Sequence, residues 1–213
     1  MRYERKYRIE GLALPLIMQS LRLHPASLRP IFSERQVNNI YFDTPGMITY
    51  KDNVAGQAQR RKYRVRWYGD KVRKIEAPNL EVKIRDMELG TKNTFPVESF
   101  HLSNLRKLTK AVNKICPEAG GMLAPVLLNS YRRVYFATAD NNFRLTIDYD
   151  LRYTPLLNNT YLYEHHYSEA QVCILELKYE SLFDDVSDRI TQYLPFRRTK
   201  NSKYVTGIDL CYW

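Results

Sequence analysis

The sequence predicts an α+β fold in which antiparallel β-strands close into a barrel with a charged lumen and helices packed on the outside. The first observation is that residues 80–85 alternate apolar and charged side chains without a break, which is the period of a strand with one dry face and one ionic face. The same alternation recurs at residues 2–9, 63–67, 143–148 and 175–180. The second is that three segments repeat the unit Glu-x-Lys, at Glu4 and Lys6, Glu81 and Lys83, and Glu176 and Lys178.

A solvated sheet is the simpler explanation for any one of these strands, because a one-sided antiparallel sheet usually turns its polar face to water. Taken together, the strands favour an enclosed face, since each Glu-x-Lys unit places an acid and a base about 7 Å apart on the same side of its strand. Strands that share one ionic face can close into a barrel whose lumen holds the charges and whose outside takes the apolar residues. Such a lumen would bind a polyanion.

The composition predicts one soluble domain, residues 1–213, because this length is enough for a sizeable core. Lys and Arg exceed Asp and Glu by 33 minus 23, a net charge of +10, which favours nucleic acid, an anionic membrane or a phosphate-rich ligand. Three cysteines without Cys-x-x-Cys spacing indicate neither a zinc site nor a disulfide framework. With no signal peptide and no apolar run of about 18 residues, we expect a cytoplasmic protein with no membrane insertion, although a membrane-bound partner remains compatible with it. The oligomeric state stays open.

The first half of the chain reads as strands with one covering helix. After the first strand, apolar residues recur at helical spacing from Leu16 to Leu23. Strand formers fill residues 37–43, and Thr44, Pro45 and Gly46 then predict a hairpin corner. Residues 59–68 and 80–87 are predicted antiparallel partners, followed by a short strand or loop that contains Lys92.

The second half begins with an amphipathic helix that carries Leu102, Leu105, Leu108, Val112 and Ile115 and stops at Pro117. Strands resume at Val126 and continue through a hairpin into residues 143–149, and residues 172–180 form the last strand. Ser181 is predicted to cap a helix that ends near Leu194. The basic tail, residues 197–204, is either a solvated turn or an anion clamp.

Seven short motifs resemble, in the same order, those of the VTC domain, the catalytic module of the vacuolar transporter chaperone polyphosphate polymerases. They are Tyr3-Glu4-Arg5-Lys6-Tyr7, Asn39-Ile40-Tyr41-Phe42-Asp43-Thr44, Arg64-x-Arg66, Leu80-Glu81-Val82-Lys83, Tyr131-x-Arg133, Leu175-Glu176-Leu177-Lys178 and Lys200-x-Ser202-Lys203-Tyr204. Each motif alone is common, but the ordered set is specific and covers nearly the whole chain. The resemblance identifies a stand-alone bacterial type within the triphosphate tunnel metalloenzyme (CYTH-like) superfamily.

The resemblance implies an eight-stranded antiparallel barrel whose basic lumen binds triphosphate or polyphosphate, with Mn²⁺ or Mg²⁺ held by a glutamate. Carried over by position, it implies catalytic phosphate contacts at Lys6, Arg64, Arg66, Lys83, Arg133, Lys200 and Lys203. It implies further phosphate contacts at Lys92, Tyr131 and Ser202, and a metal ligand at Glu176. A salt bridge to a lumen arginine is the competing interpretation of Glu176. CYTH members usually begin Glu-x-Glu-x-Lys, whereas Arg2 here favours the VTC branch.

Three functions follow as expectations. The first is an ATP-dependent polyphosphate polymerase, a phosphotransferase that passes the terminal phosphoryl group of ATP to a growing chain. The second is hydrolysis of tripolyphosphate or polyphosphate, and the third is a binding module that turns nothing over. Nucleic acid is not expected as a partner, because the basic residues alternate with acids on shared strand faces.

Overall fold

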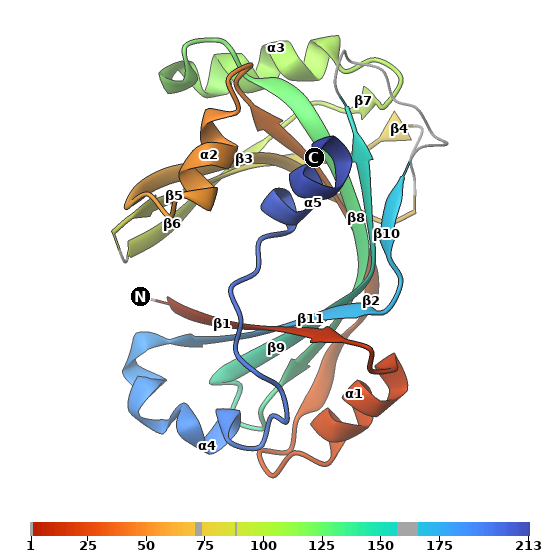
Figure 1. Cartoon of the computed structure of the whole chain (residues 1–213), viewed down its shortest axis with the longest axis vertical. Helices are drawn as coiled ribbons and strands as arrows, with labels where there is room; N and C mark the ends of the chain where they lie inside the picture. The colour runs from red at the N-terminus through yellow and green to blue at the C-terminus, as the bar shows by residue number, and fades with distance from the viewer. Residues whose placement is uncertain (1, 71–73, 88, 157–165) are drawn as a thin grey trace. The chain divides into compact units, whose positions relative to one another are not determined.

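The computed structural model describes residues 2–70, 74–87, 89–156 and 166–213, and Figure 1 draws their helices and strands. The strands are β1 (Arg2–Glu10), β2 (Arg29–Asp43), β3 (Gln59–Tyr68), β4 (Lys74–Ile75), β5 (Asn79–Asp86), β6 (Leu89–Pro96), β7 (Phe100–His101), β8 (Ala124–Ala137), β9 (Phe143–Pro155), β10 (Tyr167–Glu169) and β11 (Val172–Glu180). The α-helices are α1 (Leu14–Arg22), α2 (Ile48–Val54), α3 (Arg106–Ile115), α4 (Asp188–Thr191) and α5 (Lys203–Tyr212), and the 3₁₀ helices are η1 (Pro117–Ala119) and η3 (Ser181–Val186).

One large sheet joins most of the strands, in the order β1-β11-β9-β8-β2-β3-β5-β6, with β10 paired to β9. The pairs with an established register, β1 with β11, β11 with β9, β2 with β3, β3 with β5 and β5 with β6, are all antiparallel. The predicted α+β class with an antiparallel sheet is therefore confirmed. No pairing closes this sheet within the part of the chain that the structure describes, so the barrel stays a prediction.

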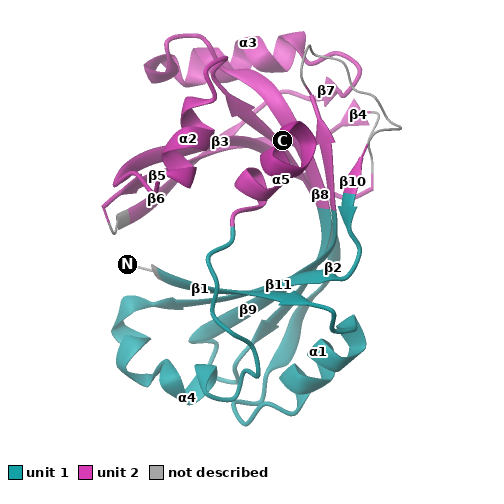
Figure 2. Cartoon of the chain, in the orientation of Figure 1, with its two compact units in different colours: residues 1–36, 131–151, 168–201 teal, residues 37–130, 152–167, 202–213 magenta. Residues whose placement is uncertain are grey.

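The chain divides into two compact units, coloured separately in Figure 2. Unit 1 comprises residues 1–36, 131–151 and 168–201, and unit 2 comprises residues 37–130, 152–167 and 202–213. The long strands β2, β8 and β9 each contribute residues to both units.

The core of unit 1 lies under one face of β1, β11 and β9. Tyr7, Leu175 and Ile147 belong to one buried cluster because the register places them side by side on this face. Ile17 and Leu21 of α1 join the same cluster with no exposed surface. The predicted helix is thus confirmed, although Leu16 and Leu23 of its apolar pattern are 52% and 74% exposed.

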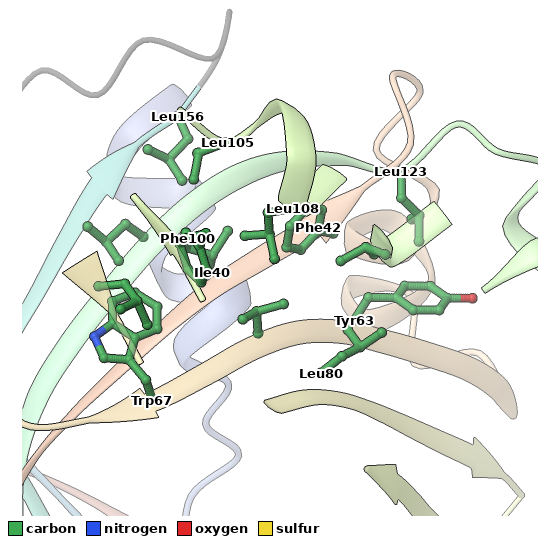
Figure 3. Close-up of a cluster of buried hydrophobic side chains, with 14 of the residues drawn as sticks. Ile40, Phe42, Tyr63, Trp67, Leu80, Phe100, Leu105, Leu108, Leu123 and Leu156 are labelled. Carbon is green, nitrogen blue, oxygen red and sulfur yellow. The ribbon is translucent and has the colours of Figure 1, made fainter. Parts of the chain in front are cut away.

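The core of unit 2 lies under one face of β2, β3 and β5, as Figure 3 shows. Ile40, Tyr63 and Leu80 come from these strands, and Leu108 of α3 packs into the same cluster. In α3, Leu108 and Val112 of the predicted stripe are buried and Ile115 is partly buried, and Cys116 and Pro117 end the helix as expected. Leu102 and Leu105 are also buried, but they precede the helix, which begins at Arg106.

Three local predictions need correction. Strand β2 begins at Arg29, eight residues before the predicted start near position 37. The prediction missed these residues because residues 29–35 are mostly exposed and carry no alternating apolar pattern. The turn after Asp43 leads into α2 rather than directly into a strand. Helix α5 was not predicted at all.

The predicted helix cap at Ser181 is also wrong. Glu180 occupies the cap position without a side-chain hydrogen bond, and Ser181 begins the 3₁₀ helix η3. In this conformation Asp184 accepts hydrogen bonds from Arg5 Nη2 at 3.3 Å and from the Tyr179 hydroxyl at 2.8 Å. The Asp184 carboxylate therefore pairs with a cation of β1.

Cys116 and Cys173 are buried and Cys211 is half-buried, all three as free thiols. No helix among the described residues is long and apolar enough to cross a membrane.

Candidate functional site

The residues implicated by the sequence fall into two sets, one in each unit. Unit 1 carries Lys6, Tyr131, Arg133, Glu176 and Lys200. Unit 2 carries Arg64, Arg66, Lys83, Lys92, Ser202 and Lys203. Strand register decides which of them share a face, because residues directly opposite in an antiparallel pair point to the same side of the sheet.

The ionic face of unit 1 is the side of β1, β11 and β9 that faces away from the apolar core. Lys6 lies opposite Glu176, which lies opposite Thr146. Glu4 and Lys178 form the next opposed pair on the same face. The alternation that placed Tyr7 and Leu175 in the core therefore brings the predicted Lys6 and Glu176 together.

Glu176 lies among three cations. Its side chain is almost fully buried, with 7% of its surface exposed. Lys178 Nζ lies 2.9 Å and Arg133 Nη2 3.7 Å from its Oε2, and Lys6 Nζ lies 3.6 Å from its Oε1. The salt bridge that competed with the metal-ligand interpretation is thus present in the structure.

Arg133 is held by a buried carboxylate that the sequence did not single out. Its Nε and Nη2 both donate to Asp148, Nη2 at 2.6 Å, and Asp148 has no exposed surface. The guanidinium also lies 5.2 Å from the centre of the Tyr131 ring. Burial lowers the pKa of Arg133, but the Asp148 charge outweighs it and holds the pKa well above its ordinary value. The cation is fixed in position and permanently charged.

The ionic face of unit 2 is formed by β2, β3, β5 and β6. Arg66 lies opposite Asn39, Arg64 lies opposite Glu81, and Lys83 lies opposite Lys92. The other face of the same strands supplies the apolar core. Four of the predicted phosphate contacts, Arg64, Arg66, Lys83 and Lys92, therefore share this one face.

Glu81 organises the cations of this face. Arg64 Nη2 lies 2.6 Å and Arg66 Nη1 3.7 Å from its Oε2, and Lys92 Nζ lies 2.9 Å from its Oε1. Arg66 Nε also donates to Asn39 Oδ1 at 2.8 Å. Burial raises the pKa of Glu81, but the charges of Arg64 and Arg66 overcome this and lower the pKa to about 2. A carboxylate that stays ionised thus holds the two arginines side by side.

The basic tail has two parts: one is hydrogen-bonded to β1 in unit 1, and the other begins helix α5 in unit 2. Within unit 1, Thr199 N donates to Lys6 O at 2.8 Å, and Lys200 next to it is exposed. Within unit 2, Ser202 caps α5 by accepting a hydrogen bond from Val205 N at 3.4 Å. Lys203, in the first turn of α5, is 8% exposed.

Unit 2 also contains a cavity of about 590 Å³. Tyr63 and Ile84, which line it, belong to the apolar side of β3 and β5, and Ile48 of α2 and Met122 lie beside them. Arg60 and Arg85, whose neighbours Arg64 and Lys83 lie on the ionic side, line it as well, so the cavity is bordered by residues from both sides of these two strands.

The carboxylates near Glu176 are already engaged by a cation. Lys6 Nζ lies 3.2 Å from Glu4 Oε1 and 3.6 Å from Glu176 Oε1, so an ammonium group already bridges these two carboxylates. No group of three His, Cys, Asp or Glu residues suits a metal ion in the described ranges of the chain. This donor set does not fit an ion held by side chains alone. A single carboxylate would be enough for a divalent ion whose other ligands are phosphate oxygens.

Comparison with known proteins gives one family match. Residues 1–212 match the VTC domain. None of the curated proteins matches the chain.

Solved structures show the same fold at low sequence identity. A protein from Vibrio parahaemolyticus, provisionally described as an adenylate cyclase, has a TM-score of 0.56 at 12% identity and covers 96% of this chain and 97% of its own. A similarly described protein from Bacillus halodurans has a TM-score of 0.56 at 12% identity, with 100% and 98% covered. The Hippeastrum protein HpAC1, described as having a dominant triphosphatase activity, has a TM-score of 0.53 at 14% identity, with 100% and 98% covered. At these identities the likeness concerns the fold.

Proposed function

The chain belongs to the VTC domain family, and from this premise we propose that it is a polyphosphate polymerase that transfers the terminal phosphoryl group of ATP to a growing polyphosphate chain. The observation that carries the proposal is the pair Arg64 and Arg66, held side by side on an ionic strand face by the buried Glu81. A pre-positioned pair of guanidinium forks is suited to a row of phosphate groups. In this proposal the sheet closes around the substrate as a barrel.

Phosphoryl transfer requires positioning and charge neutralisation more than covalent help from protein. Arg64, Arg66 and Arg133 would bind phosphate oxygens bidentately and keep donor and acceptor phosphates in line. The lysines would neutralise charge that develops on bridging oxygens; they are Lys6, Lys83, Lys92, Lys200 and Lys203. The hydroxyls of Tyr131 and Ser202 would donate hydrogen bonds to phosphate oxygens.

The divalent ion is proposed to enter as part of the substrate. Mn²⁺ or Mg²⁺ bound to a triphosphate lowers the charge that the protein must neutralise. Glu176 is the proposed carboxylate that meets this ion. The phosphates would attract Lys6, Lys178 and Arg133, which now pair with Glu176.

Hydrolysis is the second candidate, with water in place of the acceptor phosphate. It is favoured by the triphosphatase activity described for the structurally similar HpAC1. A module that binds polyphosphate without turnover is the third. We propose that the protein acts in the cytoplasm on ATP and polyphosphate. Nucleic acid is not a proposed partner, and a membrane-bound partner is compatible with this function.

The test compares the wild-type chain with Glu176→Gln and with a control, Glu98→Gln, at an exposed glutamate of unit 2. Each protein is incubated with ATP and Mn²⁺, and long polyphosphate and free phosphate are measured in the same samples. Polyphosphate from the wild type and the control, but not from Glu176→Gln, is the expected result. Free phosphate without polyphosphate would replace the polymerase by a hydrolase. If neither product forms but the chain still binds polyphosphate, the chain would be a binding module without turnover.

A further inference from the structure

The ionic face of unit 2 extends beyond the residues that the sequence resemblance assigns. On β3, Arg60 and Lys62 precede Arg64 at a spacing of two and therefore point to the same side. On β5, Arg85 follows Lys83 in the same way. Together with Arg64, Arg66 and Lys92 they make a continuous stripe of cations across β3, β5 and β6.

Like charges lie directly opposite one another along the added part of this stripe. Arg60 is paired in register with Arg85, and Lys62 with Lys83, which is paired in turn with Lys92. Like charges in directly opposed positions destabilise a sheet. Burial, and then the charge of Arg85, lower the pKa of Arg60, as repulsion between the two guanidinium groups requires. An anion on this face would relieve the repulsion.

Arg60 and Arg85 donate to neutral acceptors in the structure. Arg60 Nη1 donates to the Gln57 carbonyl oxygen, and Arg85 Nε donates to the Met87 carbonyl oxygen at 3.1 Å. Lys62 Nζ donates to Ser202 Oγ at 2.8 Å. The bonds of Arg60 and Arg85 orient the two guanidinium groups without neutralising them, whereas Arg64 and Lys92 are paired with the Glu81 carboxylate.

The length of the stripe indicates the size of the ligand. From Arg66 to Arg60 the strand advances six residues, which is about 20 Å. A triphosphate group occupies well under half of that length. The stripe therefore suits a longer row of phosphates than ATP or tripolyphosphate provides.

We propose that Arg60, Lys62 and Arg85 bind the distal phosphates of a linear polyphosphate chain and so give this site a preference for long chains over triphosphates. The proposal rests on the proposed function of the same face, since it names additional contacts for the same class of ligand. Arg64, Arg66 and Lys92 would bind the triphosphate portion, and the three added cations would bind what lies beyond it.

The test measures the affinity of tripolyphosphate and of long-chain polyphosphate for the wild type and for the double variant Arg60→Gln/Arg85→Gln. We expect the double variant to lose about tenfold or more in affinity for the long chain, as loss of two charge-assisted contacts requires, and to bind tripolyphosphate as the wild type does. The dependence of long-chain affinity on salt should weaken as well, because fewer counterions are displaced. Arg61→Gln is the matched control, since Arg61 lies on the opposite face of the same strand.

A conservative variant, Arg60→Lys/Arg85→Lys, keeps both charges and should retain most of the long-chain affinity, which separates charge loss from misfolding. Equal losses for both ligands would place the two arginines in the triphosphate site and overturn the proposal. Unchanged affinity for both ligands would make the stripe a solvated face and overturn it too. Failure of the proposed polymerase would appear separately, as absence of polyphosphate from ATP while the difference between long and short chains persists.

Discussion

The hydroxyl of Tyr204 donates a hydrogen bond to Oδ2 of Asp43 and so joins α5 to the end of β2 within unit 2. Asp43 has no exposed surface and also accepts backbone N–H groups from Thr49 at 2.9 Å and Tyr50 at 2.8 Å, in the first turn of α2. Burial, followed by the charge of Asp43, raises the pKa of Tyr204 above its ordinary value. One carboxylate thus fastens two helices to one strand end.

Replacing Tyr204 with Phe should therefore destabilise the protein without creating a cavity. The change leaves a buried carboxylate with one donor fewer, which costs about 1–3 kcal/mol of unfolding free energy. Urea denaturation measures the loss. Tyr193→Phe, at a residue that is 52% exposed, should change the unfolding free energy far less. Equal effects of the two substitutions would show that the Asp43 bond contributes nothing.

Glu81 should make stability depend on pH in the acid range. Its pKa is about 2 in the folded protein against 4.5 as the ordinary value, so its contribution is fully present above about pH 4.5 and is lost as the pH falls toward 2. In Glu81→Gln the unfolding free energy should fall less steeply across this window than in the wild type. Urea titrations at several pH values between 2 and 7 measure this slope. If Glu81→Gln and the exposed Glu98→Gln both retained the wild-type slope, Glu81 would have no such role.

Arg66→Lys should lower the affinity for tripolyphosphate although the charge is kept. A lysine cannot reproduce the fork that donates to Asn39 and reaches Glu81, so a loss of about tenfold is expected. Calorimetric titration with tripolyphosphate measures it, with Arg61→Lys as the control on the other face of β3. Undiminished affinity in Arg66→Lys would mean that point charge alone suffices at this position. Binding of single-stranded nucleic acid, measured in parallel, should not follow the loss.

Gly207→Ala should destabilise α5, although alanine is the better helix former by about 1 kcal/mol. A Cβ at this position would lie 2.5 Å from Leu127 Cδ2 and 2.5 Å from Tyr153 Cδ1, closer than atoms can approach. The Leu127 methyl can move, but the Tyr153 ring is 1% exposed and fixed, so overpacking should cost about 1–3 kcal/mol. Thermal unfolding measures the change. A raised melting temperature would show that the helix shifts to make room.

The bounds of strands were predicted most accurately where one face of the strand is buried. Strands β3 and β11 begin and end at the predicted residues, 59–68 and 172–180, because each buries one set of side chains and places the other on an ionic face. The first half of β2 lacks a buried face and was missed for that reason. Helix α5 was missed because its apolar side is defined by neighbours it meets only in the folded chain, as the close contact of Gly207 with Tyr153 shows.

The candidate site was predictable in residue type but not in pairing. Alternation put Lys6 and Glu176 on ionic faces, whereas their opposition depends on the register of β1 against β11, which no local pattern specifies. For the same reason Glu81 and Asp148 were recognised as charged residues but not as the carboxylates that hold Arg64 and Arg133. The roles of these residues toward phosphate stay predictions.

The pairing of β1 with β11 also sets an order of events during biosynthesis. Tyr3 lies opposite Tyr179 and Ile9 opposite Cys173, so β1 leaves the ribosome long before the strand with which it pairs. Until then the apolar side of β1, with Tyr7 and Ile9, has no sheet to join. Exposed hydrophobic surface of this kind is what chaperones bind and what aggregates in their absence. A nascent chain halted before β11 is complete should therefore remain chaperone-bound, while one released after Glu180 can begin to assemble unit 1.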